Sequence, residues 1–160
     1  MNLVQLKQSR KKLRAGDIFV FSLRQEKDRY RFGKIINTET NIGGFVDCSI
    51  ILIYLYNVFS YEKQNIPNLN KNDLLLAPLG INRLPWIKGY FENVGFEEVT
   101  TKNTLSIHCF KDSFKRKETY FNEFGKQIKK AKVMIGEYGL HSFMTIDDAV
   151  SEALGYPIEP

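Results

Sequence analysis

The feature that most constrains this sequence is a continuous apolar run over residues 50–56, Ile-Ile-Leu-Ile-Tyr-Leu-Tyr. The run has the length of a strand, and it lacks the polar alternation of a strand that faces water on one side. Strands that are buried on both faces of a sheet have this pattern. We therefore expect a central strand over residues 50–56 that is covered on both sides.

A pair of β-branched and aromatic segments precedes this run, over residues 18–23 and 30–36. The polar residues 24–29 separate them, so the pattern predicts a β-hairpin. Gly33 lies in the middle of the second segment, where a glycine indicates a bulge or a close backbone approach.

Further apolar segments predict strands over residues 73–79, near residues 87–94 and over residues 105–110. Residues 112–144 alternate short aromatic and Lys-rich pieces, and we expect at most two short strands or an irregular connection there. A helix is predicted over residues 145–154, because its apolar residues recur at helical spacing. Thr145 provides a start that resembles a capping box, and Gly155 with Pro157 provides the stop.

These elements predict an α+β fold: a mostly antiparallel, strongly curled β-sheet closed by one C-terminal amphipathic helix. No Pro-rich or Ser-rich linker divides the chain, so we expect one domain over residues 1–160. We favour a monomer.

Targeting signals and cross-links are not evident in the sequence. The longest apolar stretch, residues 45–59, is interrupted by Asp47 and Asn57 and is shorter than the roughly 20 residues of a membrane span. The N-terminus lacks a segment typical of a signal peptide. Cys48 and Cys109 lie in apolar runs, and we expect both to be reduced core residues. The expected location is the cytoplasm, without a membrane partner.

Charge is distributed unevenly along the chain. The net charge of +5 is composed of +7 over residues 1–34, −2 over residues 35–110, +5 over residues 111–136 and −5 over residues 137–160. A basic balance is compatible with nucleic acid, an anionic membrane or an acidic protein as partner. Sixteen of the 23 basic residues are Lys, which favours the simpler interpretation of solvated faces.

Residues capable of catalysis are scarce. His108 and Cys109 are neighbours in a predicted strand, so their side chains point to opposite faces and cannot form a dyad. His141 lies in an expected loop, and the sequence has no zinc-ligand spacing, Gly-x-Ser-x-Gly motif or phosphate-binding glycine pattern. We expect no catalytic residue, metal or cofactor. A small hydrolase would need a buried polar pocket, which a sequence cannot reveal.

The alternative function is a nucleic-acid-binding or regulatory β-domain. Residues 29–34, Arg-Tyr-Arg-Phe-Gly-Lys, interleave basic and aromatic side chains in the manner of a surface that stacks bases and contacts phosphates. The competing structural interpretation places the aromatic side chains inward and the cations outward. We favour the structural interpretation.

The order of these elements resembles the immunity protein 26 family of bacterial polymorphic-toxin systems. The resemblance rests on two motifs. The N-terminal motif is carried by Gly16, Asp17, Phe19, Leu23, Tyr30, Phe32, Gly33 and Lys34, and the C-terminal one by Tyr138, Gly139, Leu140, Ile146, Asp147, Asp148, Ala153, Leu154 and Gly155. The loop at residues 24–29 lacks the short Gly- or Asp-containing turn of that family, and residues 113–132 are unusually basic.

The resemblance implies a cytosolic protein that neutralises a cognate toxin by stoichiometric binding, without catalysis or a cofactor. Immunity proteins that block nucleases usually mimic the acidic substrate, so a charge of +5 favours a toxin with an acidic surface or a toxin of another class. We expect the partner-binding residues to be aromatic and charged side chains in and near the first hairpin loop. They are Arg24, Asp28, Arg29 and Arg31, followed by Tyr61, Lys63, Arg83 and Trp86.

Overall fold

Two β-sheets and two helices make up the computed structural model, which describes residues 1–160. The larger sheet has six strands in the order β10-β4-β3-β2-β1-β5, and the smaller has four in the order β8-β7-β6-β9. The elements are β1 (Asp17–Phe21), β2 (Tyr30–Thr40), β3 (Ile50–Ser60), β4 (Leu79–Ile81), α1 (Leu84–Lys88), β5 (Glu92–Phe96), β6 (Cys109–Lys111), β7 (Tyr120–Phe121), β8 (Gln127–Ile128), β9 (Ile135–Glu137), β10 (Leu140–His141) and α2 (Phe143–Leu154).

The first three strands form an antiparallel meander at the centre of the larger sheet. The predicted hairpin is confirmed, with Phe19 opposite Gly33 and Val20 opposite Phe32. The predicted central strand is also confirmed, because all seven residues from 50 to 56 are buried. Gly33 meets both expectations: the register shifts beside it, and a Cβ there would lie 2.3 Å from the Phe19 ring.

Different elements cover the two faces of the larger sheet. Both helices pack on one face, where Trp86 of α1 and Ile146 and Val150 of α2 join a cluster of fourteen buried side chains that includes Phe19 and Phe91. Phe110 of the smaller sheet and several loop residues pack on the other face, against Tyr54 and Tyr56. The apolar run of β3 is therefore buried from both sides, as its composition requires.

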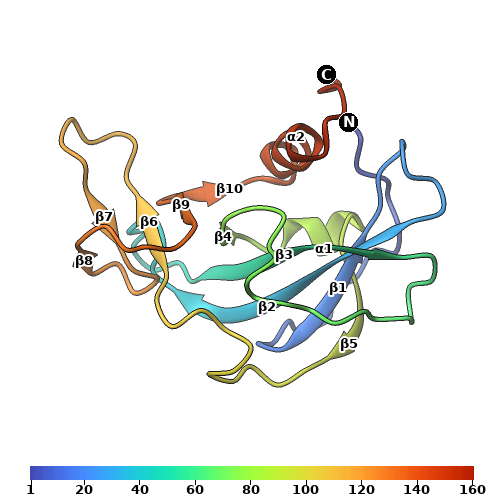
Figure 1. The fold of residues 1–160 in the computed structure, drawn as a ribbon, viewed down its shortest axis with the longest axis horizontal. Coiled ribbons are helices and arrows are strands. Elements are labelled where there is room, and N and C mark those ends of the chain that lie inside the picture. Colours follow the sequence, from blue (N-terminus) through green and yellow to red (C-terminus); the bar gives the residue numbers. More distant parts are fainter.

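The smaller sheet lies at the end of the molecule away from the chain termini, as Figure 1 shows. It contacts β3 through a polar chain in which the Tyr54 hydroxyl lies 2.5 Å from Nε2 of His108 and Nδ1 of His108 contacts Glu123. Burial raises the pKa of Tyr54 to about 12, the nearby Glu123 charge acts in the same direction, and the hydrogen bond from the Leu105 amide opposes both. Tyr54 therefore stays a neutral hydroxyl that links the two sheets.

The structure confirms an α+β fold of mostly antiparallel strands with a C-terminal helix, but the strong curl is wrong. The sheets are neither strongly curled nor closed. Two strand pairs, β4 with β10 and β6 with β9, are parallel. Neither helix has the length and apolarity needed to span a bilayer.

Several predicted elements have other bounds. In the segment 73–79 only Leu74 forms an isolated bridge, with Tyr56, and β4 begins at Leu79. The strand near residues 87–94 begins only at Glu92, because Pro85 and the left-handed Gly89 enclose the short helix α1. The strand over residues 105–110 is β6, and residues 112–144 hold four short strands instead of two at most.

The C-terminal helix begins two residues before the predicted start. Ser142 is the N-cap, and its hydroxyl accepts a hydrogen bond from the Thr145 amide while the Thr145 hydroxyl accepts one from the Ser142 amide. Thr145 is thus the third helical residue of a capping box and not its cap. The prediction for the cysteines is half right, because Cys109 is buried and Cys48 is exposed in the loop before β3.

Candidate functional site

The loop between β1 and β2, residues 24–29, is a fixed structure. Two successive tight turns form it, in which the Glu26 amide donates to the Leu23 carbonyl and the Arg29 amide donates to the Glu26 carbonyl. A loop of six polar residues would otherwise be free to move. Its position is set by what its one buried side chain, Glu26, binds.

Glu26 is held by three hydrogen bonds from two residues. Arg31 of β2 donates to both carboxylate oxygens, at 2.7 and 2.8 Å, and the Tyr156 hydroxyl donates at 2.8 Å. Burial alone would raise the pKa of Glu26, but these hydrogen bonds and the charges of Arg31 and Arg29 outweigh it and lower the pKa. The charged carboxylate therefore fastens the loop to the sheet and to the residues after α2.

The N-terminal residues hold the other side of the loop. The Arg24 guanidinium donates to the Met1 carbonyl, and the Gln25 side chain donates to the Asn2 side chain at 2.7 Å. The Asn2 side chain in turn donates to the Ser151 hydroxyl of α2 at 2.8 Å, and the Asn2 backbone amide donates to the Asp147 carboxylate at 2.9 Å. Residues from both ends of the chain thus fix the loop, and both termini lie beside it and α2 in Figure 1.

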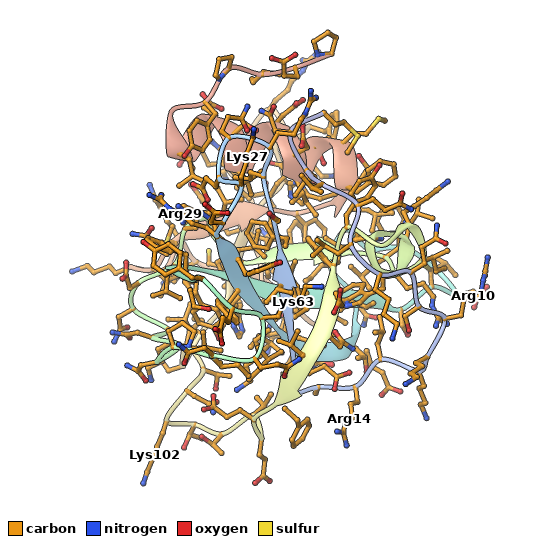
Figure 2. The ribbon with its side chains drawn as sticks, turned by 90° about the vertical axis from the view of Figure 1, so that its right-hand side faces the viewer. Arg10, Arg14, Lys27, Arg29, Lys63 and Lys102 are labelled. Carbon is orange, nitrogen blue, oxygen red and sulfur yellow. The ribbon has the colours of Figure 1, made fainter.

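Five exposed or half-exposed residues form what we term the hairpin surface: Arg24, Lys27, Asp28, Arg29 and Tyr61. They line one open hollow of about 550 Å³ together with Gln25, Glu26 and Tyr156. Figure 2 shows Lys27 and Arg29 on this part of the molecule. Four of the eight residues expected to bind a partner, namely Arg24, Asp28, Arg29 and Tyr61, are thereby brought together.

An aromatic pair supports the cations of this surface. The Arg29 guanidinium lies 4.5 Å from the centre of the Phe59 ring, and Tyr61 packs edge-on against the same ring. Tyr61 is 66% exposed, so most of its surface is free for contact. A stacked guanidinium beside an exposed tyrosine is a combination typical of the centres of protein interfaces.

The other four expected residues lie elsewhere. Arg31 is 6% exposed and occupied by Glu26, and Trp86 is 1% exposed within the core, where its indole N–H donates to Asn93 at 2.8 Å. Lys63 is half-buried and paired with Glu92 at 3.0 Å. Arg83 lines a separate groove beside the N-terminal segment.

Residues 29–34 do not form an exposed stacking surface. Phe32 and Lys34 are fully buried, and the Lys34 ammonium lies 2.8 Å from the Glu97 carboxylate. A side chain must be exposed to stack on a base or to contact a phosphate. The interleaved basic and aromatic pattern of β2 therefore belongs mainly to the packing of the sheet.

The structure brings Tyr54, His108 and Glu123 into a hydrogen-bonded chain that resembles a proton relay. Tyr54 is fully buried, and none of the five main hollows of the molecule is lined by Tyr54, His108 or Glu123. His141 is half-buried, and its Nε2 lacks a hydrogen-bond partner. Burial lowers the pKa of His141, although the nearby Glu137 charge acts to raise it. No group of three His, Cys, Asp or Glu side chains has the geometry to hold a metal ion.

Sequence reasoning missed the exposed aromatic residues on the loop between β2 and β3 and on two loops of the smaller sheet. The side chains of Phe45, Phe114 and Phe124 are 45%, 95% and 60% exposed. Phe114 is followed by Lys115, Arg116 and Lys117. The available signal was a single aromatic residue in a polar segment that has no strand or helix periodicity to bury it.

Comparison with protein families gives one match, to the model described as immunity protein 26, over residues 14–120. The matched segment holds the N-terminal motif and ends before the motif of residues 138–155. A search of curated proteins and a search of solved structures found no match. Since the family match covers about two thirds of the chain, the chain belongs to the immunity protein 26 family.

Proposed function

We propose that this protein neutralises a cognate toxin of a bacterial polymorphic-toxin system by binding it stoichiometrically in the cytoplasm. The observation that carries the proposal is the match to the immunity protein 26 family over residues 14–120. Occlusion of the toxin requires a preformed surface and no chemistry. The protein acts as one unit, as a monomer, without catalysis, cofactor or metal.

The hairpin surface is the part of the molecule that we assign to toxin binding. Arginine and tyrosine contribute more binding energy in protein interfaces than most other residues, and Arg29 and Tyr61 supply both. The loop is held from two sides by Glu26 and Asn2, so little conformational entropy is lost when a partner binds. Preorganisation of this kind favours tight binding.

The charge of this surface indicates the chemistry of the partner. Arg24, Lys27 and Arg29 outnumber the single exposed acid, Asp28. A complementary surface on the toxin would carry carboxylates, which accept the hydrogen bonds of the guanidinium groups. The toxin is therefore expected to present an acidic patch around an aromatic or apolar centre.

The test is a tagged pull-down from the native host at moderate salt, followed by mass spectrometry. Wild-type protein is compared with the double variant R29E/Y61A and with K102E, whose exposed Lys102 lies away from the hairpin surface in Figure 2. We expect one large multidomain protein to be recovered in stoichiometric amount with the wild type and K102E. Its recovery should fall about tenfold or more with the double variant, since central interface residues contribute over about 2 kcal/mol each.

Two other outcomes would change the proposal. Recovery of nucleic acid alone, lost steeply between about 50 and 200 mM salt, would favour the nucleic-acid-binding alternative. Equal recovery of the toxin with all three proteins would support toxin binding and remove the hairpin surface as its interface.

A further inference from the structure

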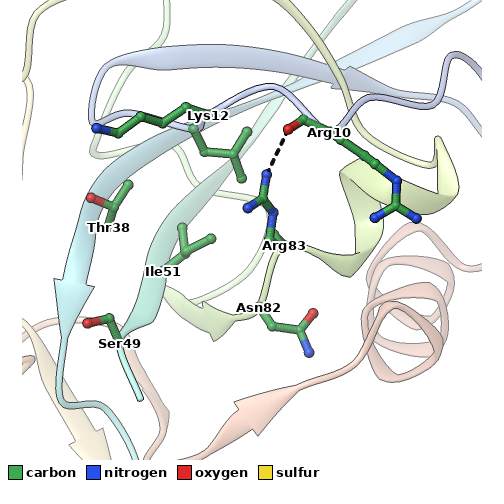
Figure 3. Close-up of a pocket in the computed structure, with 8 residues that line it drawn as sticks. Arg10, Lys12, Thr38, Ser49, Ile51, Asn82 and Arg83 are labelled. Carbon is green, nitrogen blue, oxygen red and sulfur yellow. Dashed lines mark hydrogen bonds between the residues drawn. The ribbon is translucent and has the colours of Figure 1, made fainter. Parts of the chain in front are cut away.

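A second hollow, which we term the strap groove, lies where the N-terminal segment crosses the larger sheet. It has a volume of about 480 Å³ and is lined by Arg10, Lys12, Leu13, Thr38, Ser49, Ile51, Asn82 and Arg83. Figure 3 shows Arg83 on one side of Ile51, with Asn82 below it, and Lys12, Thr38 and Ser49 along the opposite side. The groove shares no residue with the hollow at the hairpin surface.

The wall formed by the N-terminal segment is fixed in place. Nη2 of Arg83 donates to the carbonyls of Arg10 and Lys11 at 3.1 and 3.2 Å. The Ser9 amide donates to the Trp86 carbonyl at 3.0 Å. Hydrogen bonds therefore hold the backbone of this wall, and the groove does not depend on the positions of exposed side chains alone.

The polar groups that remain free in the groove are predominantly hydrogen-bond donors. None of the six ion pairs in this protein includes Arg10, Lys12 or Arg83. The side-chain oxygen Oδ1 of Asn82 already accepts from the Leu84 backbone amide at 2.9 Å, which leaves the side-chain NH₂ group of Asn82 to donate. No carboxylate lines the groove, so a ligand that only accepts hydrogen bonds and carries negative charge fits it.

The floor of the groove is apolar. Ile51 is 8% exposed, and Leu13 lines the same space. A free inorganic ion would leave this floor uncovered, whereas an organic group attached to the anion would bury it. The volume lies in the range of small-molecule sites, roughly 300–1,000 Å³.

We propose that the strap groove binds a phosphate monoester of a small organic molecule, with a mononucleotide as the simplest probe. The Arg83 guanidinium, of which only Nη2 is committed, holds the phosphate, and the exposed Lys12 side chain turns toward it from the opposite side of the groove, which Thr38 and Ser49 also line. A phosphate offers more charge and more acceptor oxygens to these donors than a carboxylate does. The organic group lies on Ile51 and Leu13. This site is independent of toxin binding.

The experiment is isothermal titration calorimetry of the full chain with adenosine 5′-monophosphate at about 150 mM salt, where charges more than about 8 Å apart are largely screened. Adenosine, inorganic phosphate and glutarate are titrated in parallel. Lys12→Glu is the test variant. Lys11→Glu is the matched control, because Lys11 is an exposed neighbour with the same charge whose side chain does not line the groove.

We expect the monophosphate to bind at least about tenfold more tightly than adenosine or glutarate, and more tightly than inorganic phosphate. Lys12→Glu should weaken it about tenfold or more, and Lys11→Glu less than about threefold. Equal weakening by both variants would mean a diffuse positive field and would overturn the site. Absence of binding at millimolar ligand, or glutarate binding as tightly as the monophosphate, would overturn the ligand class.

Discussion

The larger and smaller sheets are stabilised by different means. The strands β2 and β3 have eleven residues each, and fourteen buried side chains cluster on the face that the helices cover. The strands of the smaller sheet have two or three residues each. Their buried residues are Cys109, Phe110, Tyr120 and Gly136, and only the first three have a side chain to bury. Burial of apolar surface therefore stabilises the larger sheet far more than the smaller one.

Polar contacts supplement this small apolar contribution in the smaller sheet. The Glu123 backbone carbonyl accepts a hydrogen bond from the Asn41 backbone amide. The Glu123 carboxylate contacts Nδ1 of His108, and Nε2 of His108 is hydrogen-bonded to the Tyr54 hydroxyl of β3. The Tyr138 hydroxyl also donates to the Asn41 carbonyl, at 3.3 Å. The smaller sheet thus depends on the larger one for its position, and we expect it to open at a lower free energy.

The largest effect is expected from Phe19→Ala. The Phe19 ring is fully buried, stacks on Phe91 at 4.4 Å between centroids and meets Trp86 edge-on at 5.1 Å. Truncation leaves a cavity among aromatic rings and should lower the free energy of unfolding by about 3–5 kcal/mol. Urea denaturation measures it. Phe114→Ala, at a residue that is 95% exposed in the loop between β6 and β7, should change stability by less than about 0.5 kcal/mol.

If Phe19→Ala and Phe114→Ala lowered the free energy of unfolding by the same amount, burial of apolar side chains would not be the main source of stability of the larger sheet.

Glu26→Gln tests the polar fastening of the larger sheet and should cost about 2–3 kcal/mol, because Arg31 stays buried without its charged partner. The pKa of Glu26 is lowered in the folded protein, so its stabilising contribution is present above the ordinary pKa of 4.5. The contribution is lost as the pH falls through the lower folded value.

Urea denaturation of wild type and variant from pH 7 down to pH 3 checks both parts of this prediction. The difference between the two proteins should shrink as the pH falls. A difference that stays constant with pH would show that the charge of Glu26 contributes no stability.

Tyr54→Phe tests whether the polar chain holds the smaller sheet. The change leaves Nε2 of His108 and the Leu105 amide without their partner, at an expected cost of about 2 kcal/mol. Hydrogen exchange should show faster exchange in β6 and β7 while β1 and β3 keep their protection. Tyr61→Phe, which removes an exposed hydroxyl, is the control. Equal loss of protection in both sheets would mean that the chain stabilises the whole molecule.

The smallest effect is expected from Ser142→Ala, which removes the side-chain cap of α2 and should cost about 1 kcal/mol. Ser106→Ala, at an exposed serine outside the helices and strands, is the matched control. Thermal denaturation should show a lower midpoint for the first variant alone. An equal drop in the midpoint for both variants would mean that the Ser142 cap does not stabilise α2.

The periodicity of apolar residues along the sequence predicted those elements of the fold that neighbouring residues encode. The hairpin, the central strand and the apolar face of α2 follow from periodicity and from residues such as Gly33 and Gly155. The strands of the smaller sheet are too short to show a period, and two of them pair in parallel across distant segments. No window of the sequence contains that information.

The candidate site also contains residues whose exposure the sequence predicts and residues whose burial it does not. Arg24, Asp28, Arg29 and Tyr61 are polar or aromatic residues at a loop and a strand end, and their exposure follows from that location. Arg31 and Lys34 are cations that the sequence predicts at the surface, yet both are buried. Their burial depends on carboxylates supplied by other segments, Glu26 for Arg31 and Glu97 for Lys34.

The sequence by itself determined the family and the three central strands β1, β2 and β3 of the larger sheet, because these depend on residue types in a fixed order. Only the tertiary structure decided which charges are buried, how the smaller sheet attaches and where the strap groove forms. Each of these depends on pairs of residues far apart in the chain, such as Lys34 with Glu97 and Arg83 with Arg10. The energy of such a pair is set by distance and burial, which the order of residues does not specify.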